Sequence, residues 1–299
     1  FLKLPITYSI VTNVDKEHLD FYGSFKKLKK SFCSFIEKTP SFGKSLICID
    51  DNNLKNLLSK CKTSNFLTYG FDNKANYQII NVRKKSNHSI FDMKLKISKG
   101  KINNIKNIKV NLIGEHNISN VTASVAIALN LGIKISKIKQ ALKKFLGIQR
   151  RFTKVFSIKE REFYDDYAHH PTEINAVLKS VKSVNKNRKI ISIFQPHRYS
   201  RLRLLKNEFS KSFKLADEVV LCPVYPAGEK IDPKFNNSTF GKLIVKNSKV
   251  RLIIINSEND LFNYFRQNLI KDELIICMGA GSISSWIKSI SQNEYFRKS

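Results

Sequence analysis

The stretch from Phe163 to Glu173 constrains the fold more than any other part of the chain. It reads FYDDYAHHPTE and places two aspartates at the end of an apolar, β-like run. Pro171 suits the first position of a helix, because its φ angle is already set and no N–H donor is needed there. Apolar residues then recur at helical spacing as far as Val181. Open α/β sheets bind ligands where a strand ends and a helix begins, so we expect an α/β fold with a functional site at this turn.

The same order of strand, polar loop and helix recurs along the 299 residues, which predicts two α/β domains. We place one domain at residues 1–148 and the other at 149–299, with the hinge near residues 147–152. The first domain is expected to hold a mostly parallel sheet with antiparallel strands between residues 66 and 113. The second is expected to be a Rossmann-like open sheet. The expected strands span residues 6–12, 45–49, 77–82, 89–97, 105–112, 152–158, 162–165, 189–194, 218–221, 251–255 and 273–277. Ser24 and Ser136 are expected to cap the helices that follow them.

The charge balance is strongly basic, with 53 Lys and Arg residues against 24 Asp and Glu residues. The basic residues are mostly lysines scattered among Asn and Ile, and no motif combines aromatic and basic side chains, so we expect no specific nucleic-acid partner. No apolar run is long enough to span a membrane, and no signal-peptide pattern is present. The five cysteines show neither C-x-x-C pairs nor metal spacing, which suits a reducing cytoplasm.

Two short motifs in the first half could bind a metal or a nucleotide. His18 lies between Asp15 and Asp20 after a predicted strand, and a neutral imidazole with nearby oxygen ligands can hold a divalent ion. An ordinary polar loop would have the same composition. Asn117 and Asn120 lie three residues apart at a predicted helix start. They can cap the helix, or their amides can contact a base or a phosphate.

Basic residues form two groups in the second half. Arg150 and Arg151 lie at the predicted hinge, where an arginine can reach a phosphate with its rigid fork of donors. A solvated charge pair is the alternative. His197, Arg198 and Arg201 follow the strand predicted at 189–194. Basic residues at a helix start are unfavourable against the helix dipole unless an anion is present, so this loop is expected to bind a carboxylate or a phosphate.

The densest polar cluster is the turn that follows the strand predicted at 162–165. It contains Asp165, Asp166, Tyr167, His169 and His170. Histidines in protein cores usually occur singly, and two adjacent aspartates at a strand end are costly to bury, so we favour a functional site. The turn Gly279–Ser282 also joins a strand to a helix, and it either offers N–H groups to an anion or makes a tight turn.

Taken in order, these stretches resemble the Mur ligases. The similar stretches are TNVDKEHLDFYG at 12–23, GEHNISN at 114–120, RRF at 150–152, DDYAHHPTE at 165–173, FQPHRYSR at 194–201, VYPAGE at 224–229 and GAG at 279–281. The more specific of these stretches are those at 165–173 and 194–201. These two are close to signatures of the members that add alanine.

The resemblance implies an ATP-dependent ligase that adds L-alanine to UDP-N-acetylmuramate through an acyl phosphate during peptidoglycan synthesis, with ATP and Mg²⁺ as cofactors. It implies that His18 is a Mg²⁺ ligand, and that the nucleotide is contacted by Asn117, Asn120, Arg151 and Asp166. The expected substrate pocket contains Tyr167, His169, His197, Arg198 and Arg201. The expected catalytic residues are Asp166, His169, His197 and Arg198. Closure of the two domains is also implied.

The resemblance further implies that the family's UDP-sugar domain, its Gly-rich phosphate loop and an acidic metal ligand precede Phe1. We therefore expect that these residues alone do not ligate. Two alternatives stay open. One is a murein-peptide recycling ligase of the same family, against which the QPHRYSR stretch argues. The other is a non-catalytic module that binds a nucleotide or nucleic acid, against which the acid–histidine cluster argues. The oligomeric state is left open.

Overall fold

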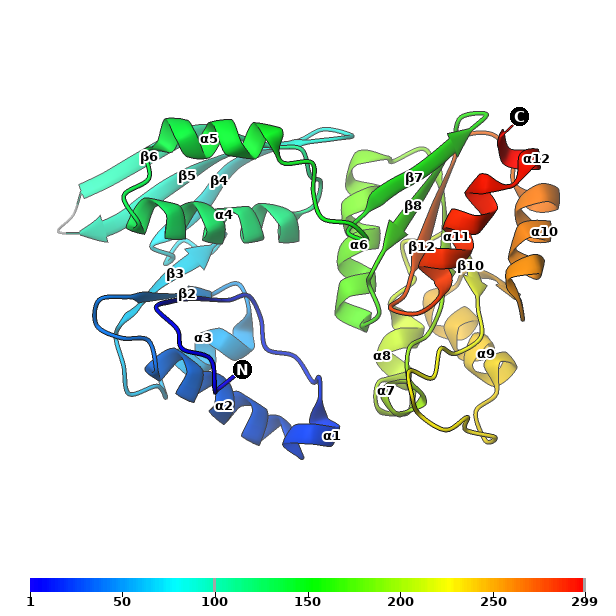
Figure 1. The fold of residues 1–299 in the computed structure, drawn as a ribbon, viewed down its shortest axis with the longest axis horizontal. Coiled ribbons are helices and arrows are strands. Elements are labelled where there is room, and N and C mark those ends of the chain that lie inside the picture. The colour runs from blue at the N-terminus through cyan, green and yellow to red at the C-terminus, as the bar shows by residue number, and fades with distance from the viewer. Residues whose placement is uncertain (99–100, 298–299) are drawn as a thin grey trace. The chain divides into compact units, whose positions relative to one another are not determined.

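The computed structural model describes residues 1–98 and 101–297 and divides the chain into two compact units, Phe1–Leu146 and Gly147–Ser299 (Figure 1). Each unit holds a six-stranded sheet with helices on both faces. The prediction of an α/β fold with largely parallel sheets is therefore confirmed. Among the helices of the described chain, none combines the length and the apolar composition that a membrane span requires.

The first unit begins with a parallel sheet and continues into antiparallel strands. Its elements are β1 (Tyr8–Val11), α1 (Leu19–Tyr22), α2 (Phe25–Glu37), β2 (Lys44–Cys48), α3 (Asn52–Leu58), β3 (Phe66–Gly70), β4 (Tyr77–Lys84), β5 (Ser89–Ser98), β6 (Lys101–Val110), α4 (Glu115–Asn130) and α5 (Ile135–Lys144). The strands lie in the order β1-β2-β3-β4-β5-β6. Neighbours from β1 to β4 are parallel, and β4, β5 and β6 pair antiparallel. The expected antiparallel strands between residues 66 and 113 are confirmed for β4, β5 and β6. Strand β3 was not predicted, and the expectation is wrong there because β3 pairs parallel with both neighbours.

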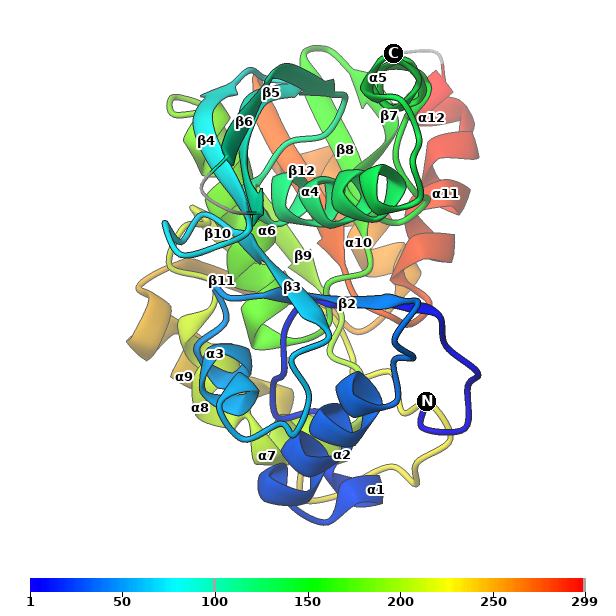
Figure 2. The same cartoon turned by 90° about the vertical axis from the view of Figure 1, so that its left-hand side faces the viewer.

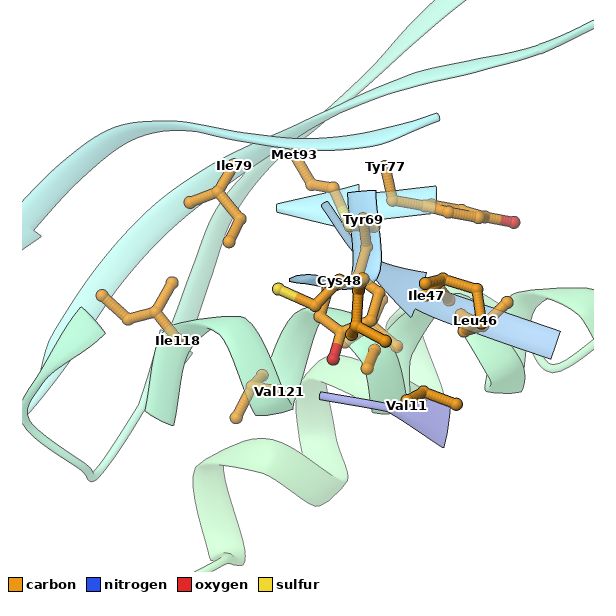
Figure 3. Close-up of a cluster of buried hydrophobic side chains, with 14 of the residues drawn as sticks. Val11, Leu46, Ile47, Cys48, Tyr69, Tyr77, Ile79, Met93, Ile118 and Val121 are labelled. Carbon is orange, nitrogen blue, oxygen red and sulfur yellow. The ribbon is translucent and has the colours of Figure 1, made fainter. Parts of the chain in front are cut away.

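The core of the first unit forms because its central strands are covered on both faces. Helix α4 lies on one face of β2 and β3, and α2 and α3 lie on the other (Figures 1 and 2). Four successive residues of β2 are buried, which is typical of a parallel strand between two helical layers. Figure 3 shows Cys48, Tyr69 and Val121 close together in this core.

Capping follows the sequence at one helix of the first unit and departs from it at another. Ser24 caps α2 as predicted, and its side chain accepts a hydrogen bond from the Lys27 N–H at 3.2 Å. The prediction of Ser136 as a cap is wrong, because α5 begins one residue earlier and Lys134 occupies the cap position. The chain turns tightly after α4, so α5 can begin directly after Lys134. The Ile138 N–H donates the first helical hydrogen bond, to the Lys134 carbonyl at 3.2 Å.

The second unit is an open sheet with one antiparallel edge. Its elements are β7 (Thr153–Ile158), β8 (Arg161–Asp166), α6 (Pro171–Val184), β9 (Lys189–Phe194), α7 (Tyr199–Leu204), α8 (Lys206–Lys211), β10 (Glu218–Leu221), α9 (Asn237–Ser248), β11 (Arg251–Ile254), α10 (Glu258–Asn268), β12 (Glu273–Met278), α11 (Ile283–Gln292) and α12 (Glu294–Arg297). The strand order is β11-β10-β9-β12-β8-β7, and only β7 runs antiparallel to its neighbour. Helices α10 and α12 have no counterpart in the sequence-based prediction.

Strand β12 is the last strand in the sequence, and it lies between β8 and β9 in the sheet. Helices α10 and α11 pack on one face of this sheet, and α6 and α8 cover the other (Figure 1). Because β8, β9, β10 and β12 are parallel, their carboxyl ends meet at one edge. The loops that carry the predicted polar motifs of this unit are therefore neighbours in space.

A buried ion cluster holds the opposite, amino-terminal edge of this sheet. Glu218 of β10 is 1% exposed and Glu273 of β12 is 0% exposed. Lys189 of β9 bridges them, with its Nζ 3.2 Å from Glu218 Oε2 and 3.0 Å from Glu273 Oε1. Tyr264 also donates a hydrogen bond to Glu218 Oε1 at 2.6 Å. Arg251 Nη1 also lies 3.6 Å from Glu218 Oε2, and Lys189 is the cation that the two buried carboxylates share.

We predict that Lys189→Met lowers the free energy of unfolding by about 3 to 5 kcal/mol, because it leaves two buried carboxylates without their shared cation. Urea unfolding of the second unit measures the loss. Lys182→Met is the matched control, since Lys182 lies 3.7 Å from Asp217 in a partly exposed pair. Such a pair contributes at most about 1 kcal/mol. Equal losses in the two variants would contradict the assignment of Lys189 as the stabilising cation.

Candidate active site

The turn after β8 is organised by the carboxylate of Asp166, which is only 3% exposed. Its Oδ1 accepts a hydrogen bond from the Ala168 N–H at 2.7 Å, and its Oδ2 accepts one from the Phe152 N–H at 2.8 Å. Burial raises the pKa of the Asp166 carboxyl to about 6. Both oxygens thus face backbone donors, and the side chain ties the turn to residues 150–152. The geometry supports a positioning role for Asp166.

Arg150 is built into the same turn through several contacts. Its carbonyl accepts a hydrogen bond from the Tyr167 N–H at 2.7 Å, and its guanidinium lies 4.7 Å from the centre of the Tyr167 ring. Its Nη2 donates to the Gly279 carbonyl at 2.6 Å, and its Nε lies 3.8 Å from Asp165 Oδ2. Asp165 also accepts a hydrogen bond from Ser284 at 2.5 Å. Arg150 therefore fixes the ring of Tyr167 and the start of the glycine turn.

Arg151 is placed differently from Arg150. Its side chain is 51% exposed, its Nη1 lies 3.7 Å from Glu173 Oε1, and its guanidinium lies 5.8 Å from the Tyr167 ring centre. Because the fork of donors reaches solvent, Arg151 is the member of the pair that can reach an anion.

His169 has one ring nitrogen fixed by the turn. Its Nδ1 lies 2.9 Å from the Tyr167 carbonyl oxygen and 3.2 Å from Glu173 Oε2. Both partners are acceptors, so Nδ1 carries the proton and Nε2 is the acceptor of the neutral ring. The ring lies edge-on to Tyr167, with 5.1 Å between their centres.

His170 closes the turn as a helix cap. It precedes α6, and its Nδ1 accepts a hydrogen bond from the Thr172 N–H at 3.4 Å. Glu173 completes a capping box by accepting from the His170 N–H at 3.2 Å. Pro171 is the first helical residue, as the sequence predicts. The two adjacent histidines therefore have different roles: the His169 ring faces the site, and the His170 ring stabilises the start of α6.

His197, after β9, faces His169. The two ring centres lie 5.7 Å apart, and the His197 ring stacks on Tyr225 with a centre distance of 5.7 Å. Arg201 Nη1 lies 3.3 Å from His197 Nδ1. A guanidinium can only donate, so Nδ1 accepts and the neutral ring carries its proton on Nε2. Burial and the positive charge of Arg201 lower the pKa of His197 to about 4, so the ring is neutral at physiological pH.

Arg198 occupies the cap position of α7 with a φ of 69°. A positive φ is costly for a residue with a side chain, and such strain concentrates at functional sites. Its N–H donates to the Tyr225 carbonyl at 2.9 Å, and the Tyr225 N–H donates to the Pro196 carbonyl at 2.8 Å. These bonds join the loop after β9 to the loop after β10 and bring His197, Arg198 and Arg201 to the same edge.

The structure adds Gln195 and Tyr225, which the sequence did not single out. Gln195 is buried, its Oε1 accepts a hydrogen bond from the Ile283 N–H at 2.9 Å, and its Nε2 donates to Ser282 at 3.0 Å. A Cβ atom on Gly281 would lie 2.4 Å from Tyr225 Cγ. The glycine turn is therefore explained by close packing, and the Gly279 N–H already donates to the Asp166 carbonyl at 3.2 Å. Gln195 directly follows a buried strand, and that position was the sequence signal that could have identified it as a site residue.

Three predicted residues lie in the first unit. His18 is exposed with a φ of 53° just before α1. Within residues 1–98 and 101–297, no group of three candidate metal ligands includes His18, so its role as a Mg²⁺ ligand stays a prediction. The capping interpretation of Asn117 and Asn120 is wrong, because Gly114 is the cap of α4. The Asn117 amide donates to the Ile113 carbonyl at 2.8 Å, and Asn120 is exposed.

We predict a pH-dependent effect of Asp166→Asn. Burial raises the pKa of this carboxyl from about 4 in the unfolded chain to about 6 in the folded chain, so the folded wild type takes up a proton first as the pH falls. The stability of the wild type relative to the variant should therefore rise by about 2 kcal/mol between pH 7 and pH 4. Urea unfolding at several pH values measures this difference. Asp272→Asn, at an exposed position with a positive φ, is the control. A flat difference for Asp166→Asn would refute the raised pKa.

Comparison with known proteins assigns both units to one family. Residues 2–128 match the Mur ligase middle domain, and residues 150–281 match the Mur ligase, glutamate ligase domain. The chain is 51% identical over 292 residues to the UDP-N-acetylmuramate–L-alanine ligase of Pelagibacter ubique, covering 98% of this chain and 63% of that protein. It is 36% identical to the enzyme of the same name from Brucella anthropi, covering 96% of this chain and 61% of that protein. The chain thus spans less than two thirds of the length of these relatives.

A solved structure gives the same assignment of fold. The UDP-N-acetylmuramate-alanine ligase of Thermotoga maritima superposes with a TM-score of 0.74 at 24% identity, covering 98% of this chain and 60% of that one. A murein peptide ligase from Psychrobacter arcticus superposes with a TM-score of 0.65 at 20% identity, covering 95% of this chain and 56% of that one. The chain belongs to the Mur ligase family and carries its middle domain and its glutamate ligase domain.

Proposed function

We propose that the chain forms the middle and C-terminal domains of an ATP-dependent ligase that joins L-alanine to UDP-N-acetylmuramate. The relatives that are 36% and 51% identical carry this name. The observation that carries the proposal is the convergence of His169, His197 and Arg201 at the carboxyl edge of the second sheet. We also propose a cytoplasmic location, which suits five cysteines that are all free thiols.

The reaction class sets what the site must do. ATP transfers its γ-phosphoryl group to the sugar carboxylate, and the amine of alanine then forms the C–N bond as the acyl C–O bond to phosphate breaks. The amine must lose a proton when it attacks. We propose that His169 accepts this proton at Nε2, because Tyr167 and Glu173 hold the proton of the ring on Nδ1.

The neighbouring groups suit the charges that develop in the second step. His197 is neutral and carries its proton on Nε2, so it can donate to the oxyanion of the tetrahedral intermediate. Arg198 and Arg201 follow on the same loop and are assigned to the alanine carboxylate or the departing phosphate. Tyr167 and Tyr225 form aromatic walls beside the two imidazoles.

Within each unit, we propose residues that contact the nucleotide. Asn117 uses its amide N–H on the Ile113 carbonyl, which leaves its Oδ1 to accept from a base amino group. Asn120 is exposed one turn further along α4, and Arg151 can reach a phosphate. Asp166 acts by holding residues 152 and 168. The described residues offer His18 without a cluster of further ligands, so no step is assigned to Mg²⁺.

We predict that Arg198→Ala lowers kcat/KM for L-alanine by about 100-fold, the loss expected for one charge-assisted contact to an anion. The assay uses a chimera that joins this chain to the part of the Pelagibacter ubique relative that it does not match, and it measures phosphate release. Arg203→Ala is the matched control, because Arg203 lies on the same helix and its Nη1 bonds to Asp232 at 2.6 Å. An unchanged alanine dependence in Arg198→Ala would remove Arg198 from the pocket.

The same chimera separates the proposal from its two rivals. Turnover with free L-alanine and not with a ready-made tripeptide supports the proposal, whereas the opposite preference supports a recycling ligase. Retention of a random oligonucleotide at physiological salt, without turnover of either substrate, supports a non-catalytic binding module.

A further inference from the structure

Three potential metal ligands meet in the first unit, away from the site described above. Cys33 and Glu37 lie one turn apart on α2, and Cys61 follows α3. One ligand atom from each side chain lies within 4.8 Å of the other two. Cys33 and Cys61 are 28 positions apart, so their spacing carries no metal-site signal in the sequence, and packing of α2 against α3 brings them together (Figure 2).

The distances fit a tetrahedral cation. Cys33 Sγ lies 3.4 Å from Glu37 Oε1. Two ligands of a tetrahedral zinc ion, with a sulfur at about 2.3 Å and a carboxylate oxygen at about 2.0 Å, are separated by about 3.5 Å. The cluster therefore already has one edge of the coordination tetrahedron.

A backbone contact holds the carboxylate in place. The Lys62 N–H, next to Cys61, donates to Glu37 Oε1 at 2.7 Å. Groups that orient a ligand in this way are part of ordinary metal sites. Glu37 and Cys61 are partly exposed, and Cys33 is 9% exposed, so the cluster lies at the surface and an ion can enter it.

We propose that Cys33, Glu37 and Cys61 form a binding site for one zinc ion, with a water molecule as the fourth ligand. Two thiols and a carboxylate suit a borderline-soft divalent cation and not Mg²⁺, which prefers oxygen ligands. On binding, two Zn–S bonds form, the two S–H bonds break, and the two thiol protons pass to the solvent.

The position of the cluster indicates a structural role for the ion. Glu37 ends α2 before β2, and Cys61 precedes β3, so the cluster lies near the amino ends of two parallel strands. The Asn65 amide donates to the Pro40 carbonyl at 2.6 Å, which joins the segment before β3 to the segment before β2. Ligands of open α/β sheets bind at the carboxyl ends. A zinc ion here would join α2 to the segment between α3 and β3 without touching a substrate.

The experiment titrates the metal-free, reduced chain with Zn²⁺ against a chromophoric chelator and with Co²⁺ as a spectroscopic probe. We expect one ion per chain, release of about two protons per zinc ion, and a thiolate-to-cobalt charge-transfer band. Cys33→Ser or Cys61→Ser should weaken zinc binding by more than about 100-fold and reduce the band. Glu37→Gln should weaken binding by about 10- to 100-fold and keep the band.

Cys48→Ala is the matched control, because Cys48 lies in the same unit with its Sγ 3.7 Å from Ser119 Oγ and outside the cluster. It should bind zinc as the wild type does. If a serine variant does not fold, alkylation of the wild type followed by mass spectrometry replaces it, and zinc should slow the modification of Cys33 and Cys61 but not of Cys48. Absence of stoichiometric binding, a cobalt spectrum without the thiolate band, or no protection from alkylation would overturn the site. None of these readouts depends on ligase activity.

Discussion

The buried carboxylate of Asp166 is the constraint on which the site depends. Leaving an ionised carboxylate out of water is costly, and two backbone N–H groups, from Phe152 and Ala168, offset much of that cost. The raised pKa, about 6, indicates that the offset is incomplete. The same two bonds order the site, because one holds Ala168 against Asp166 around Tyr167 and the other ties the segment of Phe152 to this turn. The Tyr167 carbonyl then fixes the His169 ring.

Electrostatic interactions also set which ring nitrogens of His197 and His169 carry a proton. Burial, together with the fixed positive charges of Arg201 and Arg198, lowers the pKa of His197 and keeps the imidazole neutral. A neutral ring whose Nδ1 accepts from Arg201 must donate from Nε2. His169 has the opposite tautomer, since its Nδ1 faces two acceptors. Two facing imidazoles thus offer one donor and one acceptor, which is the pair that proton transfer and oxyanion binding require.

Local chemistry explains which features could be predicted from the sequence. Strands β9 and β10 have the predicted bounds, because both are short apolar runs closed by polar loops. Pro171 and Glu173 reveal the start of α6 because capping acts within four residues. Tyr225 was not singled out, since its contact with His197 depends on β9 and β10 being neighbours. Helix α10 was missed although Ser257 caps it. The roles proposed for individual site residues still rest on geometry and resemblance.

The two edges of each sheet carry different kinds of polar chemistry. In the second unit the carboxyl edge holds imidazoles and arginines that reach solvent, whereas the amino edge holds Glu218 and Glu273 closed around Lys189. In the first unit the amino edge holds the cysteine–glutamate cluster. Parallel strands account for this division. In each crossover a helix returns the chain to the amino edge, and side-chain contacts there hold the helix end in place. Groups at that edge can form strong, closed interactions because no substrate has to enter between them. Substitutions there should therefore change stability, while substitutions of the solvent-facing imidazoles and arginines at the carboxyl edge should change chemistry.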